Sequence, residues 1–355
     1  MAAAPIPIPI QIRTRTPTQT ADLMPRLAVL FTGGTISMTV DPVAGGNVPT
    51  LDGAAILART PGLDEYATLV PVDLGRTPAS HFTPTRLVEI FALLAGQLAD
   101  PAIDGAVVVQ GTDSIEETAF CWDLLLDSAK PVVVTGAMRS ASEPGYDGPA
   151  NLRDAVAAAA SPLLRGSGVT VVLGGTIEAA DDVAKTHASS LTTFRSPNAG
   201  SLGTVVGGRV ALFRPRGPRR HVATRVASER VHLITAVTGM DGSLVDAAVA
   251  AGAEGLVIAA TGVGNTSPGL LDAASRAMAR GIRVALTTRT GGGRATTGYA
   301  FPGGGATWVR AGAMLAGHLN GPKARIALSL GLGAGLPRDA LAALLEDPAW
   351  PEAQG

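Results

Sequence analysis

Short runs of apolar, often β-branched residues recur along this chain, and longer segments with apolar residues at every third or fourth position separate them. The short runs predict buried strands, and the longer segments predict amphipathic helices. The expected strands cover residues 27–31, 69–74, 106–109, 131–135, 169–173, 231–235, 256–260 and 282–287. The expected helices cover residues 84–98, 115–127, 149–160, 244–251, 268–280, 322–330 and 338–345.

Strands that alternate with helices predict an α/β fold whose mostly parallel sheets are covered by helices on both faces. A stretch rich in arginine and proline, residues 213–229, is expected to link a larger N-terminal α/β domain (26–212) to a smaller C-terminal α/β domain (230–350). The same stretch lacks the interleaved aromatic residues of a nucleic-acid-binding patch. Residues 1–25 are expected to form a flexible tail, because proline interrupts their apolar part and the order of charge and apolar residues is the reverse of a signal peptide.

Composition excludes several classes of protein. The formal net charge of -1 argues against a nucleic-acid partner. No uninterrupted apolar stretch reaches the roughly 18 residues of a membrane span. Because residues 1–25 lack the pattern of a signal peptide, we expect a cytoplasmic protein. The single cysteine, Cys121, rules out an internal disulfide, and the five histidines lack metal-ligand spacing, so we expect no metal.

Two strand ends carry the residues most typical of chemistry. The run Thr32-Gly-Gly-Thr35 follows the first expected strand, and Gly111-Thr112-Asp113 follows the third. Ligands of open α/β sheets bind at the carboxyl ends of the strands, and glycine allows a close approach of the backbone. The first run lacks the third glycine of a dinucleotide-binding fingerprint. From the residues alone, a nucleophilic threonine and a purely structural turn both explain the first run, and Asp113 could be only a helix N-cap.

Lysine is rare, because only Lys130, Lys185 and Lys323 occur among 28 basic residues. A retained lysine is a candidate for a task that arginine cannot perform, such as proton exchange. Lys185 follows an expected strand in a polar segment and could activate the hydroxyl of Thr112, which is a poor nucleophile by itself. Chance retention of any one lysine stays open as the alternative.

The two threonine motifs resemble the signature motifs of the bacterial-type L-asparaginases. Further matching segments follow in the order of that family, at residues 131–139, 147–152, 182–186, 196–203, 262–265 and 323–325. The resemblance covers about residues 26–335. It implies hydrolysis of L-asparagine to L-aspartate and ammonia through an acyl-enzyme, with no cofactor, by a homodimer or homotetramer that takes a small-molecule amide.

The resemblance also implies the roles of the catalytic residues. Thr35 matches the threonine nucleophile, Thr112 the second essential threonine, and Lys185 the lysine beside it. Asp113 matches the carboxylate that binds the α-amino group of the substrate.

Four further positions match substrate-binding positions of the family. Ser80 matches the hydroxyl on the α-carboxylate of the substrate, and His81 stands where a glutamine is often found. From the residues alone, His81 is a solvated loop residue. Backbone N–H groups at the glycine turns, Gly111 among them, and at Ala137 would hold the developing oxyanion.

The chain departs from the family at three places. The mobile loop at residues 39–60 lacks the usual tyrosine, Gln110 replaces a histidine, and no acidic residue occurs between Asp272 and Asp339 in the second domain. Tyr299 is a weak candidate to replace the glutamate that many members take from a neighbouring subunit. The alternatives are therefore a glutaminase or other small-amide hydrolase, which includes the related amidotransferase subunit, and an inactive ligand-binding homologue.

Overall fold

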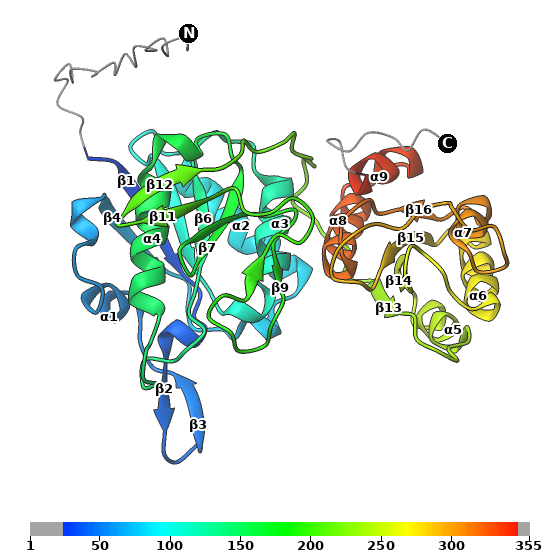
Figure 1. Cartoon of the computed structure of the whole chain (residues 1–355), viewed down its shortest axis with the longest axis horizontal. Helices are drawn as coiled ribbons and strands as arrows, with labels where there is room; N and C mark the ends of the chain where they lie inside the picture. The colour runs from blue at the N-terminus through cyan, green and yellow to red at the C-terminus, as the bar shows by residue number, and fades with distance from the viewer. Residues whose placement is uncertain (1–23, 347–355) are drawn as a thin grey trace, which may run out of the picture.

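A computed structural model describes residues 24–346 and contains two α/β bodies, which lie side by side in Figure 1. The N-terminal body is built on an eight-stranded sheet in the order β12-β11-β8-β7-β6-β5-β1-β4. Its strands are β1 (Arg26–Phe31), β4 (Thr68–Asp73), β5 (Gly105–Val109), β6 (Val132–Thr135), β7 (Val169–Leu173), β8 (Thr176–Ala179), β11 (Gly203–Val206) and β12 (Arg209–Leu212). The five strands from β4 to β7 are parallel, whereas β8, β11 and β12 form an antiparallel margin.

Helices cover both faces of this sheet because residues alternate in direction along each buried strand. Ala28 and Leu30 of β1 pack with α2 (Pro84–Ala99) and α3 (Ile115–Leu125) on one face. Leu27 and Val29 pack with α4 (Gly148–Ala160) and α1 (Gly53–Ala58) on the other. Two small antiparallel pairs complete the body: β2 (Met38–Asp41) with β3 (Gly46–Pro49), and β9 (Ala184–Lys185) with β10 (Phe194–Arg195).

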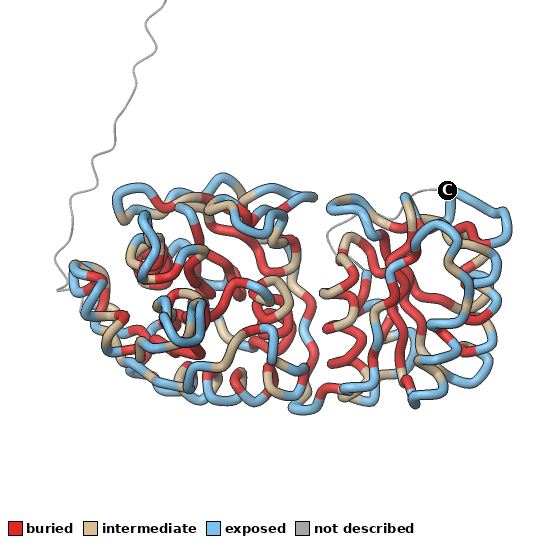
Figure 2. The backbone as a smooth tube through the Cα atoms, turned by 90° about the horizontal axis from the view of Figure 1, so that it is seen from below, coloured by how far each residue is buried: buried red, intermediate tan, exposed pale blue. Residues whose placement is uncertain are grey.

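The C-terminal body is built on a four-stranded parallel sheet in the order β13-β14-β15-β16. Its strands are β13 (Val231–Thr235), β14 (Gly255–Ala260), β15 (Arg283–Thr288) and β16 (Met314–Leu315), and its helices are α5 (Ser243–Ala250), α6 (Pro268–Ala279), α7 (Gly305–Ala311), α8 (Gly321–Gly333) and α9 (Arg338–Leu345). Helix α8 packs against β13 and β14 and, across the boundary, against α3. Figure 2 shows the buried backbone of each body on either side of that boundary.

The α/β fold class expected from the sequence is confirmed, with a large N-terminal sheet that is mostly parallel and a smaller parallel C-terminal sheet. Every strand and helix predicted from the apolar pattern is present, with ends shifted by a few residues. The expected tail at 1–25 and the expected domain end at 350 lie largely outside residues 24–346.

One tight turn lies within the N-terminal sheet. Gly174 and Gly175 join β7 to β8 in an antiparallel hairpin. Both glycines have positive φ angles, 58° and 76°, which a two-residue hairpin turn of this type requires.

Candidate active site

The two threonine turns meet at the carboxyl edge of the N-terminal sheet. Strands β1 and β5 are parallel neighbours, and the N–H of Thr32 donates to the carbonyl of Val109 at 3.0 Å. Gly34 has a φ of 96°, and a Cβ at this position would lie 2.2 Å from the Cα of Gly111. No side chain fits between the turns, so glycine is required there to bring their backbones into contact.

The structure distinguishes the two threonines of the first turn. Thr32 is 2% exposed, and its Oγ1 donates to the carbonyl of Val109 at 3.2 Å. Thr35 opens a short 3-10 helix, Thr35–Ser37, and is half-buried. Within residues 24–346, no hydrogen-bond partner is found for the Thr35 hydroxyl. Thr32 therefore supports the turn, and Thr35 is the threonine whose hydroxyl is available to a ligand.

Lys185 connects both functional side chains of the second turn. Its Nζ donates to Thr112 Oγ1 at 3.0 Å and to Asp113 Oδ1 at 2.8 Å. The side chain of Lys185 is 15% exposed and that of Asp113 is 71% exposed, so the group opens to solvent on the side of the carboxylate. Ser114, and not Asp113, occupies the N-cap position of α3. The carboxylate of Asp113 thus pairs with a lysine and does not cap the helix.

A glutamate holds the backbone of Lys185. The N–H of Lys185 donates to Glu116 Oε2 at 3.0 Å, and Lys185 pairs with Phe194 in the short β9–β10 ladder. Glu116 lies in the first turn of α3, where a carboxylate also suits the helix dipole. The contact with Lys185 joins residues that lie 69 positions apart in the sequence.

The predicted substrate-binding residues lie at the same edge. Ser80 and His81 are exposed in a short turn, Ala79–His81, and the carbonyl of Ala79 accepts a hydrogen bond from Ser114 Oγ at 3.1 Å. Buried Ala137 follows Gly136, where a Cβ would lie 3.2 Å from the Cγ2 of Thr112. The chain thus brings all the predicted site residues together, and their roles toward a substrate stay predictions.

Tyr146 is a residue near the site that the sequence analysis did not identify. Its hydroxyl donates to the carbonyl of Ile36, next to Thr35, at 2.8 Å. Burial raises the pKa of Tyr146 to about 12, so the hydroxyl stays protonated near neutral pH and acts as a donor that holds the turn. The available signal was its place directly before Asp147, the first residue of a segment that matches the family.

Gln110, which replaces a histidine of the family, and Tyr299, the weak candidate to replace the missing glutamate, have different surroundings. Gln110 is fully buried, and its Nε2 donates to Thr118 Oγ1 at 2.9 Å, so it serves the packing beneath the turn. Tyr299 is 49% exposed on the C-terminal body, where its ring lies 5.7 Å from that of Phe301. Within the described part of one chain, Phe301 is therefore its aromatic neighbour.

Residues 24–346 contain neither a cluster of metal ligands nor a membrane-spanning helix. No group of three or more histidine, cysteine, aspartate or glutamate side chains is arranged to hold a metal ion. None of the described helices has the length and apolarity needed to cross a membrane.

Comparisons with known proteins cover both bodies of the chain. The family model described as Asparaginase, N-terminal, matches residues 26–217, and the Glutaminase/Asparaginase C-terminal domain matches residues 230–345. A probable L-asparaginase of Deinococcus radiodurans is 39% identical over 322 residues, which are 89% of this chain and 95% of that relative. An L-asparaginase of Bacillus licheniformis is 30% identical over 310 residues, 86% of this chain and 94% of the relative.

The fold agrees as well. The crystal structure of a probable cytoplasmic L-asparaginase from Campylobacter jejuni superposes with a TM-score of 0.80 at 26% identity, and covers 90% of this chain and 99% of that one. The two domain matches, the relatives and the paired threonine turns lead to one conclusion: this chain belongs to the asparaginase family.

Proposed function

We propose that this protein hydrolyses L-asparagine to L-aspartate and ammonia through a covalent acyl-enzyme. The observation that carries the proposal is the bridge from Lys185 Nζ to Thr112 Oγ1 and Asp113 Oδ1, beside the glycine contact that brings the Thr35 turn to the same place. The relatives described above as L-asparaginases support L-asparagine as the substrate. A small polar amide suits a site formed by a lysine, carboxylates and hydroxyl groups.

In the proposed reaction Thr35 is the nucleophile. Its Oγ1 attacks the side-chain amide carbon, the hydroxyl proton passes to the amide nitrogen, and the C–N bond breaks to release ammonia. Water then attacks the ester, one of its protons returns to the oxygen of Thr35, and L-aspartate leaves. Backbone N–H groups of the glycine turns and of Ala137 are proposed to stabilise the oxyanion in both halves.

The remaining residues have complementary roles in this scheme. Lys185 and Thr112 are proposed to move the proton, because a lysine within hydrogen-bond distance of a hydroxyl can exchange one with it. Asp113 is proposed to bind the ammonium of the substrate, and Ser80 and His81 are proposed to meet its carboxylate. The exposure of Asp113 leaves its second oxygen accessible to such a ligand.

A variant of this mechanism has one specific observation in its favour. The lysine contacts the hydroxyl of Thr112 and not that of Thr35, so Thr112 is an alternative first nucleophile. Mass spectrometry of enzyme quenched during turnover identifies the acylated threonine. An adduct on the peptide that contains Thr35 supports the main scheme, and an adduct on the Thr112 peptide replaces it with the variant.

The activity itself is tested by initial rates of ammonia release. The purified protein should act on L-asparagine faster than on L-glutamine or D-asparagine. A preference for glutamine would make it a glutaminase, and absence of ammonia from all three amides, with ligand binding retained, would make it a binding homologue.

We also propose a homodimer or homotetramer that acts in the cytoplasm on a small-molecule amide. The cytoplasmic assignment rests on the structural relative from Campylobacter jejuni, a probable cytoplasmic L-asparaginase. Light scattering coupled to size exclusion measures the assembly directly, and a monomeric mass with full activity would contradict the proposed assembly.

A further inference from the structure

Lys323 occupies an unfavourable place for a cation. It lies in the first turn of α8 and is 1% exposed. The positive end of the helix dipole disfavours a positive charge there, and burial lowers the pKa of Lys323. The charges of Glu116, Asp181 and Asp182 act in the opposite direction and favour the protonated form. A lysine kept at such a position indicates a specific contact.

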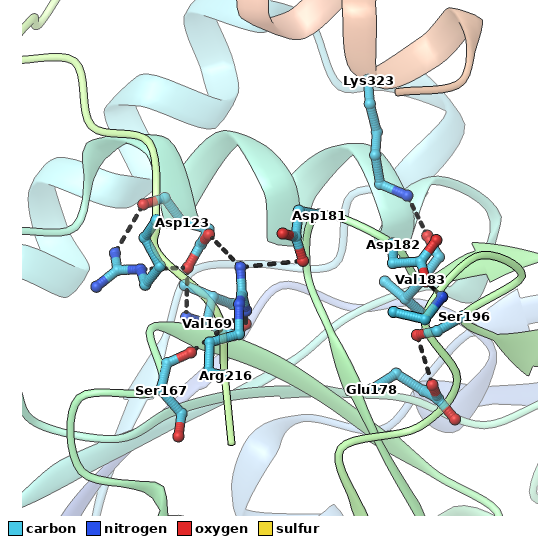
Figure 3. A network of polar contacts seen from close by, with 12 residues as sticks. Asp123, Ser167, Val169, Glu178, Asp181, Asp182, Val183, Ser196, Arg216 and Lys323 are labelled. Atoms are coloured by element: carbon cyan, nitrogen blue, oxygen red, sulfur yellow. Dashed lines mark hydrogen bonds and ion pairs between the residues drawn. The ribbon is translucent and has the colours of Figure 1, made fainter. Parts of the chain in front are cut away.

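That contact crosses the boundary between the two bodies. The Nζ of Lys323 donates a hydrogen bond to the carbonyl of Val183, and Figure 3 shows the side chain reaching from α8 to this segment. Val183 lies two residues before Lys185, whose own N–H is bound by Glu116. The short segment that carries the site lysine is therefore held from the C-terminal body on one side and from α3 on the other.

A second contact fixes the same segment. The carboxylate of Asp182 accepts hydrogen bonds from the N–H of Asn198 at 3.1 Å and of Ala199 at 2.7 Å, and Asn198 Oδ1 accepts one from the N–H of Gly293 in the C-terminal body at 2.8 Å. These hydrogen bonds tie the segment before Lys185 to residues 198–199 and, through Asn198, to the C-terminal body.

We propose that Lys323 is a positioning residue: by holding the carbonyl of Val183, it sets the place of Lys185 and couples the docking of the C-terminal body to the active site. The effect on catalysis rests on the proposed function, in which Lys185 acts on Thr112. The geometric coupling does not depend on the identity of the substrate.

Lys130 provides a matched control for the test. Its Nζ also donates to backbone carbonyls, those of Leu98 at 2.7 Å and Asp100 at 2.8 Å, but these lie on the α2 side of the N-terminal body. Lys323→Met removes the donor and keeps the apolar stem. We expect it to lower kcat for L-asparagine by about tenfold to a hundredfold, as for a displaced catalytic group. Lys130→Met should leave kcat within about twofold, because it changes a contact away from the site.

A double-mutant cycle separates positioning from a general effect on the fold. If Lys323 acts through Lys185, most of the loss caused by Lys323→Met disappears in a Lys185→Arg background, because the two changes are coupled. An equal further loss in that background, or a normal kcat in a folded Lys323→Met protein, overturns the proposal.

Amide hydrogen exchange supplies a readout that needs no activity. Exchange in the peptide that contains residues 184–186 should be faster in Lys323→Met than in the wild type, and unchanged in Lys130→Met. If the wild type releases no ammonia, the proposed function fails, and this measurement still decides the coupling. Unchanged exchange overturns the proposal whatever the kinetics show. Should Lys323→Met fail to fold, Lys323→Gln shortens the side chain and keeps a polar group. Faster exchange at residues 184–186 in that variant supports the proposal, and unchanged exchange overturns it.

Discussion

Both bodies end their parallel strands in glycine turns that carry threonines, yet the hydroxyl groups have different partners. In the C-terminal body, Thr261 Oγ1 donates to the carbonyl of Asn265 at 2.7 Å and Thr288 Oγ1 to that of Gly262 at 2.6 Å. In the N-terminal body, Thr112 Oγ1 accepts from Lys185. A hydroxyl bound to a backbone carbonyl stabilises a turn, whereas a hydroxyl beside a lysine can exchange a proton.

Charge differs between the two edges in the same way. The N-terminal edge combines Lys185 with Asp113 and Glu116. The C-terminal body has no acidic residue between Asp272 and Asp339. A strand end is therefore a place where an active site can form. The site itself forms only where side chains from other elements converge on that strand end.

The strongest test of this comparison replaces one threonine at each edge. Thr35→Ala removes the proposed nucleophile and should lower kcat by roughly 10³-fold or more, as with the loss of other nucleophiles. Thr261→Ala, at the second edge, removes a hydrogen bond of about 1 kcal/mol and should leave kcat nearly unchanged. Ammonia release and circular dichroism measure activity and folding. Most of the activity surviving in folded Thr35→Ala would refute the nucleophile assignment.

A second test concerns Lys185, the lysine that contacts a threonine hydroxyl at the first edge. Lys185→Arg keeps the charge but loses easy proton exchange, so we expect kcat to fall by about 10²-fold, the scale of general acid–base catalysis. The melting temperature should change little, because the positive partner of Asp113 is retained. A near-normal rate would mean that Lys185 contributes only its positive charge and no proton transfer.

A third test concerns Asp113, which pairs with Lys185 and is proposed to bind the ammonium of the substrate. Asp113→Asn should raise KM for L-asparagine by about tenfold to a hundredfold, the effect of losing a hydrogen bond to a charged group. The loss of kcat/KM should be much smaller for an analogue without the α-amino group. Equal losses on both substrates would mean that Asp113 serves Lys185 and that the ammonium is recognised elsewhere.

The smallest effect is expected at Asp181, near the boundary between the two bodies. Burial alone would raise the pKa of Asp181, but the charges of Arg216, His318 and other basic neighbours outweigh it and hold this pKa below its ordinary value. The folded-state pKa is thus the lower one, so the stabilisation is complete above the unfolded-state pKa of about 3.9 and is lost as pH falls through the folded-state pKa.

Melting curves at several pH values measure this contribution. Asp181→Asn should lower the melting temperature at neutral pH, and the difference from the wild type should shrink as the pH falls below about 4. Asp246→Asn is the matched control, since Asp246 forms an exposed ion pair with Arg276 at 3.0 Å and such pairs add little stability. A difference that stays constant down to low pH would contradict the assignment to Asp181.

The sequence alone determined the main strands and helices, because a buried strand or an amphipathic helix is written in the local spacing of its apolar residues. It missed the strands β2, β3, β8, β9, β10, β11, β12 and β16 and the helices α1 and α7, all of which are short. The glycine turns were also predicted from the sequence, and Lys185 was identified as a candidate because lysine is rare in this chain. Local pattern identified which residues were candidates and at which strand ends they lie.

Only the tertiary structure decided the partners of those residues. It separated Thr35 from Thr32, and it joined Lys185 to Thr112 across 73 residues, Tyr146 to Ile36 across 110, and Lys323 to Val183 across 140. No periodic pattern encodes such pairs, since they depend on the order of strands in the sheet and on how α8 packs against α3. The sequence determines the chemistry of each side chain, whereas the fold determines its hydrogen-bond partner.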